Sequence, residues 1–332
     1  MSSAESSDTS RPPAVTVLIP VFNAGTMLHE AVASILAQDF TDFECLVIND
    51  GSTDGAFDAL RTWPDPRLRL VDNPGNLGLI ATLNRGLELA RAPLLARMDA
   101  DDVALPQRLS RQVAAFAAEP QLMLLGTWAT LIDPRGQAAG VSRTPTAHDE
   151  ILRAILTNNA FIHPSVMART AVLRALGGYP ADALHAEDYA LWLRVAARYR
   201  VRNLPEPLLQ YRIHPGQVSQ RKLAAQRAMA QRLQDAARTE FDELGVLPRA
   251  MQPHRPTAWS RLRAAPGTLG HDYLALARRN RLLGSTKLAR DAAFAGLSAA
   301  PLSLDLWREW VPAQANPRRW LRWLRGGRTH RQ

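Results

Sequence analysis

The chain opens with four short apolar runs separated by segments of helical periodicity, and this alternation constrains the fold more than any other feature. The runs cover residues 15–20, 44–49, 68–71 and 94–98. They are rich in β-branched residues and lack strict polar alternation, as expected of strands covered on both faces. Strands that alternate with helices predict βαβ units, and therefore an α/β fold with a mainly parallel sheet flanked by helices.

Acidic residues follow two of the predicted strands. Asp50 comes directly after the second strand, while Asp99, Asp101 and Asp102 follow the fourth. Ligands of open parallel sheets bind outside the carboxyl ends of the strands. The acids therefore gather where a ligand is expected, and carboxylates at one strand end suit Mg²⁺ or Mn²⁺.

Both acidic segments also have a purely structural interpretation. Asp101 and Asp102 can cap the next helix and supply its first-turn acids. Asp50 lies in an Asn-Asp-Gly-Ser turn that precedes a helix. The residues alone leave both interpretations open.

Further along the chain, Glu187 and Asp188 begin a helix predicted over residues 187–197. Acids are favourable at a helix N-terminus, so this pair also has a structural interpretation. A carboxylate there can instead act as a general base beside a hydroxyl substrate. His163 and His214 are weaker candidates because each stands alone.

Length and composition predict a globular protein of about two domains among its 332 residues. No apolar run reaches the ~18 residues of a membrane span. Residues 1–13 are polar and Ser-rich, so we expect a disordered N-terminus rather than a secretory signal. Cys45 is the only cysteine, which excludes an intramolecular disulfide and favours a cytoplasmic location.

Charge is distributed unevenly along the chain. Residues 1–220 carry 19 basic and 23 acidic side chains, whereas residues 221–332 carry 21 and 8. This basic region is predicted to be helical over residues 223–244, 272–283, 286–299 and 304–310. Residues 317–332 contain six arginines and two tryptophans. That composition suits an anionic membrane interface, and a packed Trp/Leu edge followed by a solvated tail is the alternative.

Several stretches occur in one order along residues 14–218: VTVLIPVFNAG, CLVINDGSTDG, NPGNLGLIATLNRGLELA, ARMDADDVALPQRL, FIHPSVM, GGYP and AEDYALWLR. Together they resemble the family-two inverting glycosyltransferases of non-processive bacterial type. The resemblance implies a GT-A, Rossmann-like α/β fold over residues 14–218 with a C-terminal α-helical extension over residues 219–332. Residues 14–105 would form the nucleotide-binding half, and residues 106–218 the acceptor-binding half.

The resemblance also implies residue roles. Asp188 would be the catalytic base, with Glu187 beside it. The nucleotide-sugar donor would contact Pro20, Asn23, Asp50, Asn76, Gly78, Arg97, Asp99 and Ala100. The Mn²⁺ or Mg²⁺ ligands would be Asp99, Asp101 and His214.

The implied reaction transfers a sugar from a nucleoside diphosphate sugar, with UDP expected, to a saccharide or lipid-linked acceptor in cell-surface polysaccharide or glycolipid assembly. No nucleic-acid partner is expected, and residues 317–332 would place the enzyme at the inner face of the cell membrane. Asn49 departs from the family, which often has an acid there. The Gln-x-x-Arg-Trp motif of processive synthases is absent after Asp188.

Three other classes of protein can contain such an alternation of strands and helices. A nicotinamide-dependent dehydrogenase needs a G-x-G-x-x-G turn after the first strand, and this turn is absent. A sugar nucleotidyltransferase would need a Gly-rich basic loop at the same place. A non-catalytic nucleotide-sugar-binding protein stays as the alternative that only an activity measurement excludes.

Overall fold

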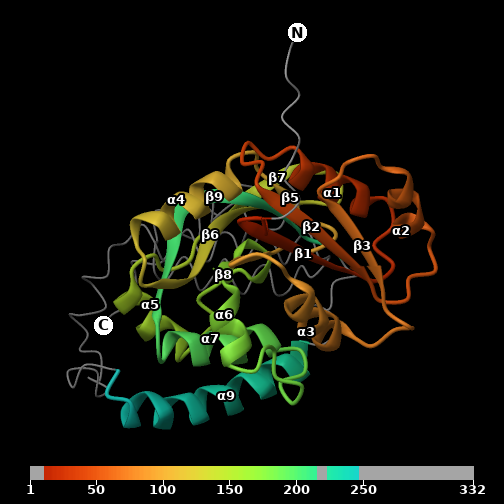
Figure 1. Cartoon of the computed structure of the whole chain (residues 1–332). Coiled ribbons are helices and arrows are strands. Elements are labelled where there is room, and N and C mark those ends of the chain that lie inside the picture. Colours follow the sequence, from red (N-terminus) through yellow and green to blue (C-terminus); the bar gives the residue numbers. More distant parts are fainter. Residues whose placement is uncertain (1–10, 215–222, 247–332) are drawn as a thin grey trace, which may run out of the picture. The chain divides into compact units, whose positions relative to one another are not determined.

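The computed structural model describes residues 11–214 and 223–246 (Figure 1). In chain order, its elements are β1 (Val15–Val21), α1 (Met27–Leu36), β2 (Phe43–Asn49), α2 (Ala56–Ala59), η1 (Leu60–Thr62), β3 (Leu68–Asp72), α3 (Leu79–Leu89), β4 (Leu94–Arg97), β5 (Val103–Ala104), α4 (Arg108–Ala118), β6 (Leu122–Ile132), β7 (Ala138–Ser142), α5 (His148–Ile155), η2 (His163–Ser165), β8 (Met167–Arg169), α6 (Thr170–Ala175), α7 (Glu187–Ala196), β9 (Arg200–Arg212) and α9 (Leu223–Glu243). The chain divides into two units, Met1–Pro253 and His254–Gln332, and every described residue belongs to the first.

One sheet runs through the described part of the chain in the order β3-β2-β1-β4-β8-β6-β9-β5, with β7 paired to β6. The strands β3, β2, β1 and β4 are all parallel. Beyond β4 the sheet becomes mixed, because β8 is antiparallel to both β4 and β6 while β9 is parallel to β6. The α/β fold prediction is confirmed, and its parallel half is the one formed by the first four predicted strands.

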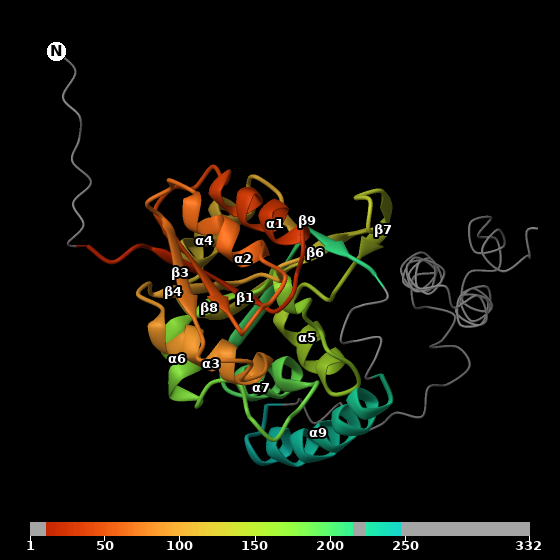
Figure 2. The same cartoon turned by 90° about the vertical axis from the view of Figure 1, so that its right-hand side faces the viewer.

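Helices cover both faces of the sheet, as Figures 1 and 2 show. Every residue of β1 is buried. Val17 and Ile19 pack into a core with residues of α1 and α4, while Leu18 points to the opposite core with residues of α3, α5 and α7. The two-residue period of a strand sends alternate side chains to the two faces, which explains why this strand is apolar throughout.

The helix α9 belongs to the same packed unit. Ala237 and Phe241 on its inner face are buried in the core that also holds α7. The Arg198 guanidinium lies 2.5 Å from the Glu240 carboxylate, and the Gln234 amide donates to the carbonyl of Thr157 at 2.9 Å. The helix predicted over residues 223–244 is therefore present and packs beside α7 (Figure 2).

Two segments differ from the element that their sequence pattern favours. The apolar residues of 161–167 favour a strand, but the chain forms the 3₁₀ turn η2 there and β8 begins only at Met167, because Pro164 has no N–H to give to a sheet. The helical spacing of residues 56–63 favours one continuous helix, which the chain forms as the α-turn α2 followed by the 3₁₀ turn η1. The predictions for residues 272–283, 286–299, 304–310 and 317–332 lie outside the described residues.

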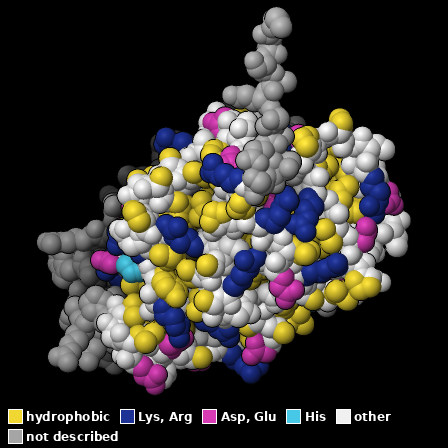
Figure 3. All heavy atoms as spheres, viewed as in Figure 1, with side chains coloured by type: hydrophobic (Ala, Val, Ile, Leu, Met, Phe, Trp, Pro, Cys, Tyr) yellow, Lys and Arg dark blue, Asp and Glu magenta, His cyan; other side chains and the backbone are white. Residues whose placement is uncertain are grey.

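Within the described ranges, no helix is both long and apolar enough to cross a membrane. Lys and Arg side chains are spread among hydrophobic and neutral ones over the face seen in Figure 3.

Candidate active site

Strands β1, β2 and β4 end at the same edge of the sheet. Asn49 at the end of β2 pairs with Val21, and Arg97 at the end of β4 pairs with Leu18. The Met98 N–H still donates to the Leu18 carbonyl at 3.1 Å, after which the chain leaves the sheet. Strands β2 and β4 lie on opposite sides of β1, about 10 Å apart. This is the switch point at which ligands of doubly wound sheets bind.

Asp50 anchors the loop that precedes α3. Its Oδ1 accepts from the Asn73 amide at 2.7 Å and from the Leu77 N–H at 2.8 Å, and its Oδ2 accepts from the Gly78 N–H at 2.9 Å. A carboxylate offers about four acceptor positions, and three of those on Asp50 are used by described residues although the residue is only 4% exposed. Asn76 is exposed in the same loop. The predicted donor-binding residues Asp50, Asn76 and Gly78 therefore form one structural unit.

Asn23 follows β1 and is held by the turn after β2. Its Oδ1 accepts from the Thr53 N–H at 2.8 Å, and its own N–H donates to Ser52 Oγ at 3.0 Å. Pro20 is buried within β1, next to the carboxyl end of the strand, so its side chain is part of the packing there. Phe22, which the sequence reasoning passed over, is 54% exposed at the end of β1. An exposed aromatic directly after a central strand was the signal that could have identified it.

The three aspartates after β4 form a compact acidic cluster. One carboxylate oxygen from each of Asp99, Asp101 and Asp102 lies within 4.8 Å of the others, a group that can hold a metal ion. His214, at the end of the first described range, places Nε2 2.8 Å from Asp101 Oδ2. Asp99 and Asp101, two of the predicted metal ligands, therefore lie close together, and the third, His214, contacts Asp101. Asp102 was not a predicted ligand, but its carboxylate belongs to the same cluster.

Asp102 forms the buried floor of this cluster. Its Oδ1 accepts from the Arg212 N–H at 2.8 Å. Burial raises the pKa of Asp102 well above its ordinary value, and the charges of Asp101 and Asp99 raise it further. Ala100 is also nearly buried between the acids, so its side chain serves packing.

Arg97 is a buried cation beneath the acidic cluster. Its side chain is 2% exposed and its guanidinium contacts the Asp99 carboxylate. Burial is the largest influence and opposes the charge, but the attraction and hydrogen bond of Asp99, together with Tyr179 and Asp102, leave the pKa of Arg97 raised. Burial also raises the pKa of Asp99, with Arg97 acting in the opposite direction. Among the described residues, the Nε and Nη1 atoms of Arg97 have no hydrogen-bond partner.

Glu187 and Asp188 occupy the first turn of α7, as predicted. Burial, followed by the charge of Asp188, raises the pKa of Glu187 to about 7. Burial also raises the pKa of Asp188, while the Tyr189 N–H, the charge of Arg97 and the Asn159 amide oppose that shift. The charge of Arg97 thus lowers the pKa of both carboxyls of this pair, as it does for Asp99.

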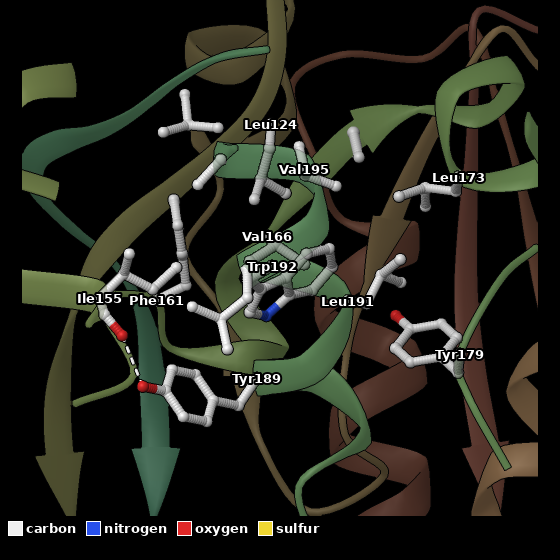
Figure 4. Close-up of a cluster of buried hydrophobic side chains, with 14 of the residues drawn as sticks. Leu124, Ile155, Phe161, Val166, Leu173, Tyr179, Tyr189, Leu191, Trp192 and Val195 are labelled. Atoms are coloured by element: carbon white, nitrogen blue, oxygen red, sulfur yellow. Dashed lines mark hydrogen bonds between the residues drawn. The ribbon is translucent and has the colours of Figure 1, made fainter. Parts of the chain in front are cut away.

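Aromatic side chains lie beside Arg97 and the acidic pair. Trp192 and Tyr179 pack edge to face, with ring centroids 6.1 Å apart (Figure 4). The Tyr179 hydroxyl lies 3.1 Å from His163 Nε2, and burial holds the pKa of His163 well below its ordinary value. His163 is thus a neutral member of this packed layer. Such apolar surroundings strengthen every charge interaction nearby.

Asn84 of α3 holds the backbone of Tyr179 in this layer. The Asn84 amide donates to the Tyr179 carbonyl and its Oδ1 accepts from the Tyr179 N–H, both at 2.8 Å. A side chain at Gly178 would place a Cβ 2.4 Å from Asn84 Oδ1. The Gly-Gly-Tyr segment therefore fits because glycine admits this close approach. No local sequence pattern predicts the Asn84 contact, since the two partners lie 95 positions apart in the chain.

Similar proteins identify the family of this chain. The family model described as glycosyl transferase family 2 matches residues 16–177. An uncharacterized glycosyltransferase of Haemophilus influenzae is 31% identical over 218 residues, which are 62% of this chain and 68% of that protein. The amylovoran biosynthesis glycosyltransferase AmsE of Erwinia amylovora is 31% identical over 212 residues, 62% of this chain and 79% of AmsE.

Solved structures share the architecture. S. aureus TarS residues 1–349 in complex with UDP has a TM-score of 0.55 and 18% identity, covering 91% of this chain and 93% of that one. The mannosyltransferase PcManGT from Pyrobaculum calidifontis, in complex with GDP-Man and Mn²⁺, has a TM-score of 0.51 and 20% identity, covering 96% and 80%. These likenesses show the GT-A fold.

Fold and relatives together define the protein as a glycosyltransferase enzyme. The chain belongs to glycosyltransferase family 2.

Proposed function

We propose that the protein is an inverting, metal-dependent glycosyltransferase that moves a sugar from a nucleoside diphosphate sugar to an acceptor hydroxyl. The observation that carries this proposal is the arrangement around Arg97. The buried Arg97 contacts Asp99 of the acidic cluster, and its charge favours ionisation of Glu187 and Asp188. This supports a single site that contains both a donor-binding edge and a candidate base.

The base of the donor binds at the carboxyl end of β1 and β2. The remaining acceptor position of the Asp50 carboxylate suits a base N–H, and the exposed ring of Phe22 offers a surface for stacking. We infer UDP as the donor nucleotide, which the UDP complex of TarS supports. Asn23 and the loop containing Asn76 would enclose it.

A divalent metal fits the acidic cluster. Asp99, Asp101 and Asp102 supply hard carboxylate oxygens within 4.8 Å of one another, the donor type that Mg²⁺ and Mn²⁺ prefer. His214 is the remaining candidate ligand beside Asp101. When bound there, the ion would neutralise charge on the departing diphosphate. The Mn²⁺ complex of PcManGT supports this assignment.

Asp188 takes the proton of the acceptor hydroxyl. The acceptor oxygen forms a bond to the anomeric carbon as the bond from that carbon to the diphosphate breaks, and the hydroxyl proton passes to the carboxylate. Attack from the side opposite the leaving group inverts the anomeric configuration. One general base of this kind contributes about 10² to 10⁴ in rate.

The acceptor is a saccharide or lipid-linked saccharide in cell-surface polysaccharide or glycolipid assembly. The name of AmsE, an amylovoran biosynthesis glycosyltransferase, supports this choice. The partition into residues 14–105 for the nucleotide and 106–218 for the acceptor stays part of the proposal. A cytoplasmic location at the inner face of the membrane, through residues 317–332, also stays a prediction.

Paired substitutions test the assignments. Asp188→Asn should retain UDP affinity in Mn²⁺ but lose roughly 10²-fold or more in sugar transfer. Asp101→Ala should weaken Mn²⁺-dependent UDP binding measured by calorimetry. Asp182→Asn, at an exposed acid in the loop before α7, is the matched control and should change neither quantity. Near-normal transfer by Asp188→Asn would disprove the base assignment, and unchanged UDP affinity in Asp101→Ala would disprove the metal assignment.

A further inference from the structure

Asn159, in the segment between α5 and η2, contacts the candidate base directly. Its Nδ2 donates to Asp188 Oδ2 at 2.8 Å. Its Oδ1 accepts from the Phe161 N–H at 3.1 Å, and its own N–H donates to Asn158 Oδ1 at 2.9 Å. An amide whose oxygen already faces a backbone N–H must present its NH₂ group to the carboxylate, so both partners fix its orientation.

The adjacent carboxyls Glu187 and Asp188 have unequal surroundings. Glu187 is 7% exposed, and its pKa is raised to about 7. Asp188 has the same kind of burial penalty but receives the Asn159 amide and the Tyr189 N–H. Two neighbouring carboxyls whose surroundings differ in this way separate into a protonated member and an ionised member.

Other charged and titratable groups face the pair from neighbouring elements. Arg97 at the end of β4 favours ionisation of both carboxyls, while Asp99 opposes the charge of Glu187. Tyr179 is close enough for both acids to raise the pKa of its hydroxyl. None of these three distinguishes Asp188 from Glu187 by a hydrogen bond in the described structure, whereas Asn159 does.

We propose that Asn159 is a positioning residue that makes Asp188, rather than Glu187, the ionised base and that fixes the orientation of its carboxylate through Oδ2. This inference rests on the proposed function for the role of Asp188 as base. Its electrostatic part concerns the chain alone and can be measured without any substrate.

Three variants separate this role from a merely structural one. Asn159→Ala removes the donor. Asn159→Asp keeps an oxygen for the Phe161 N–H but replaces the donor with a second carboxylate. Asn158→Asp adds the same charge at the exposed neighbouring position and keeps the oxygen that accepts the Asn159 N–H, so it is the matched control.

The first measurement is a carboxyl ¹³C NMR titration of the full chain without ligand, with the Asp188 and Glu187 signals assigned through Asp188→Asn and Glu187→Gln. A hydrogen bond to a charged group corresponds to a shift of about one to two pH units. Asn159→Ala should raise the Asp188 midpoint by that amount, and Asn159→Asp should raise it further. Asn158→Asp should leave it near the wild-type value.

The second measurement is the pH profile of UDP release from UDP-glucose and UDP-N-acetylglucosamine with Mn²⁺. In Asn159→Ala the acid limb should move upward by about the same one to two pH units as the Asp188 midpoint, with the KM for the donor nearly unchanged. An Asp188 midpoint that is unmoved in both Asn159 variants would overturn the inference. Failure of the wild type to release UDP, with the NMR shift present, would count against the proposed function and the base role but not against the charge assignment.

Discussion

At the residue scale, the site brings carboxyl groups within the electrostatic influence of the buried Arg97 guanidinium. Asp99, Asp102, Glu187 and Asp188 all have a raised pKa because burial penalises their charged forms. Arg97 compensates part of that penalty for each of them. Active sites commonly hold perturbed acids of this kind, and the cost appears as lost stability.

Glu187 makes this cost measurable. Its pKa is about 7 in the folded protein and ordinarily 4.5. A carboxyl with a raised folded-state pKa contributes stability that is fully present below the unfolded value and is lost as pH rises through the folded value. We therefore expect the free energy of unfolding to fall between pH 4.5 and pH 8, with Glu187 contributing at most about 3 kcal/mol.

Urea denaturation of Glu187→Gln between pH 5 and pH 8 checks this expectation. The neutral amide cannot ionise, so the variant should lose less stability than the wild type as pH rises. Glu88→Gln, at an exposed acid of α3, is the control and should follow the wild-type curve. If Glu187→Gln lost stability as steeply as the wild type, the assignment of the raised pKa to Glu187 would be wrong.

The site divides into residues that the sequence could predict and residues that it could not. Asp50, Asp99 and Asp101 follow strands that are recognisable from their apolar runs, so strand order alone gathers them at one edge. Asn159 reaches Asp188 only through tertiary packing between separate elements. A hydrogen bond between residues 29 positions apart leaves no periodic trace in the sequence, so no local pattern predicts it.

At the element scale, the loop between β3 and α3 depends on the turn after β2. Gly51 has a φ of 78°, and a Cβ there would lie 2.8 Å from the Asn76 nitrogen and 2.9 Å from the Gly75 carbonyl carbon. Those are backbone atoms, so the loop must move to accept a side chain. Because Asp50 holds the same loop, such a movement would disturb the proposed donor pocket.

Gly51→Ala should therefore weaken calorimetric UDP binding in Mn²⁺ by roughly tenfold or more, which is about 1.4 kcal/mol. Gly55→Ala is a matched control, because its φ of 74° imposes similar strain while nothing lies within 4 Å of the added Cβ. Both variants should lose about 1 kcal/mol of stability from the left-handed backbone, but only Gly51→Ala should lose donor affinity. Equal losses of affinity in the two variants would rule out the loop contact as the cause.

The elements themselves were predictable where burial on both faces imposes an unbroken apolar run. The strands β1 and β2 are the clearest cases. The stretch 161–167 also contains apolar residues, but Pro164 interrupts it, and Phe161 and Val166 reach the core from either side of a 3₁₀ turn rather than from a ladder. Apolar composition reports burial, and it does not by itself distinguish a strand from a buried turn.

At the scale of the whole molecule, α9 extends the core past the residues that the family model matches. The matched range ends at residue 177, whereas α9 begins at Leu223. The Gln226 amide donates to the His185 carbonyl at 3.0 Å, in the segment that leads into Glu187. His185 has a φ of 69°, which is unfavourable for a residue with a side chain. Such a conformation persists only where surrounding contacts stabilise it, and the hydrogen bond from Gln226 is one of them. The helix therefore supports the start of α7 from outside.

Phe241 tests whether α9 is part of the cooperative core. Its side chain is fully buried in the cluster that also contains residues of α7, so Phe241→Ala should cost about 3–5 kcal/mol and lower the Tm on the order of 10 °C. Leu244→Ala, 49% exposed just after the same helix, should change the Tm by no more than about 2 °C. Calorimetric scans of both variants measure the two Tm values. If Phe241→Ala had the same Tm as Leu244→Ala, the packing of α9 would not contribute to the stability of the core that contains α7.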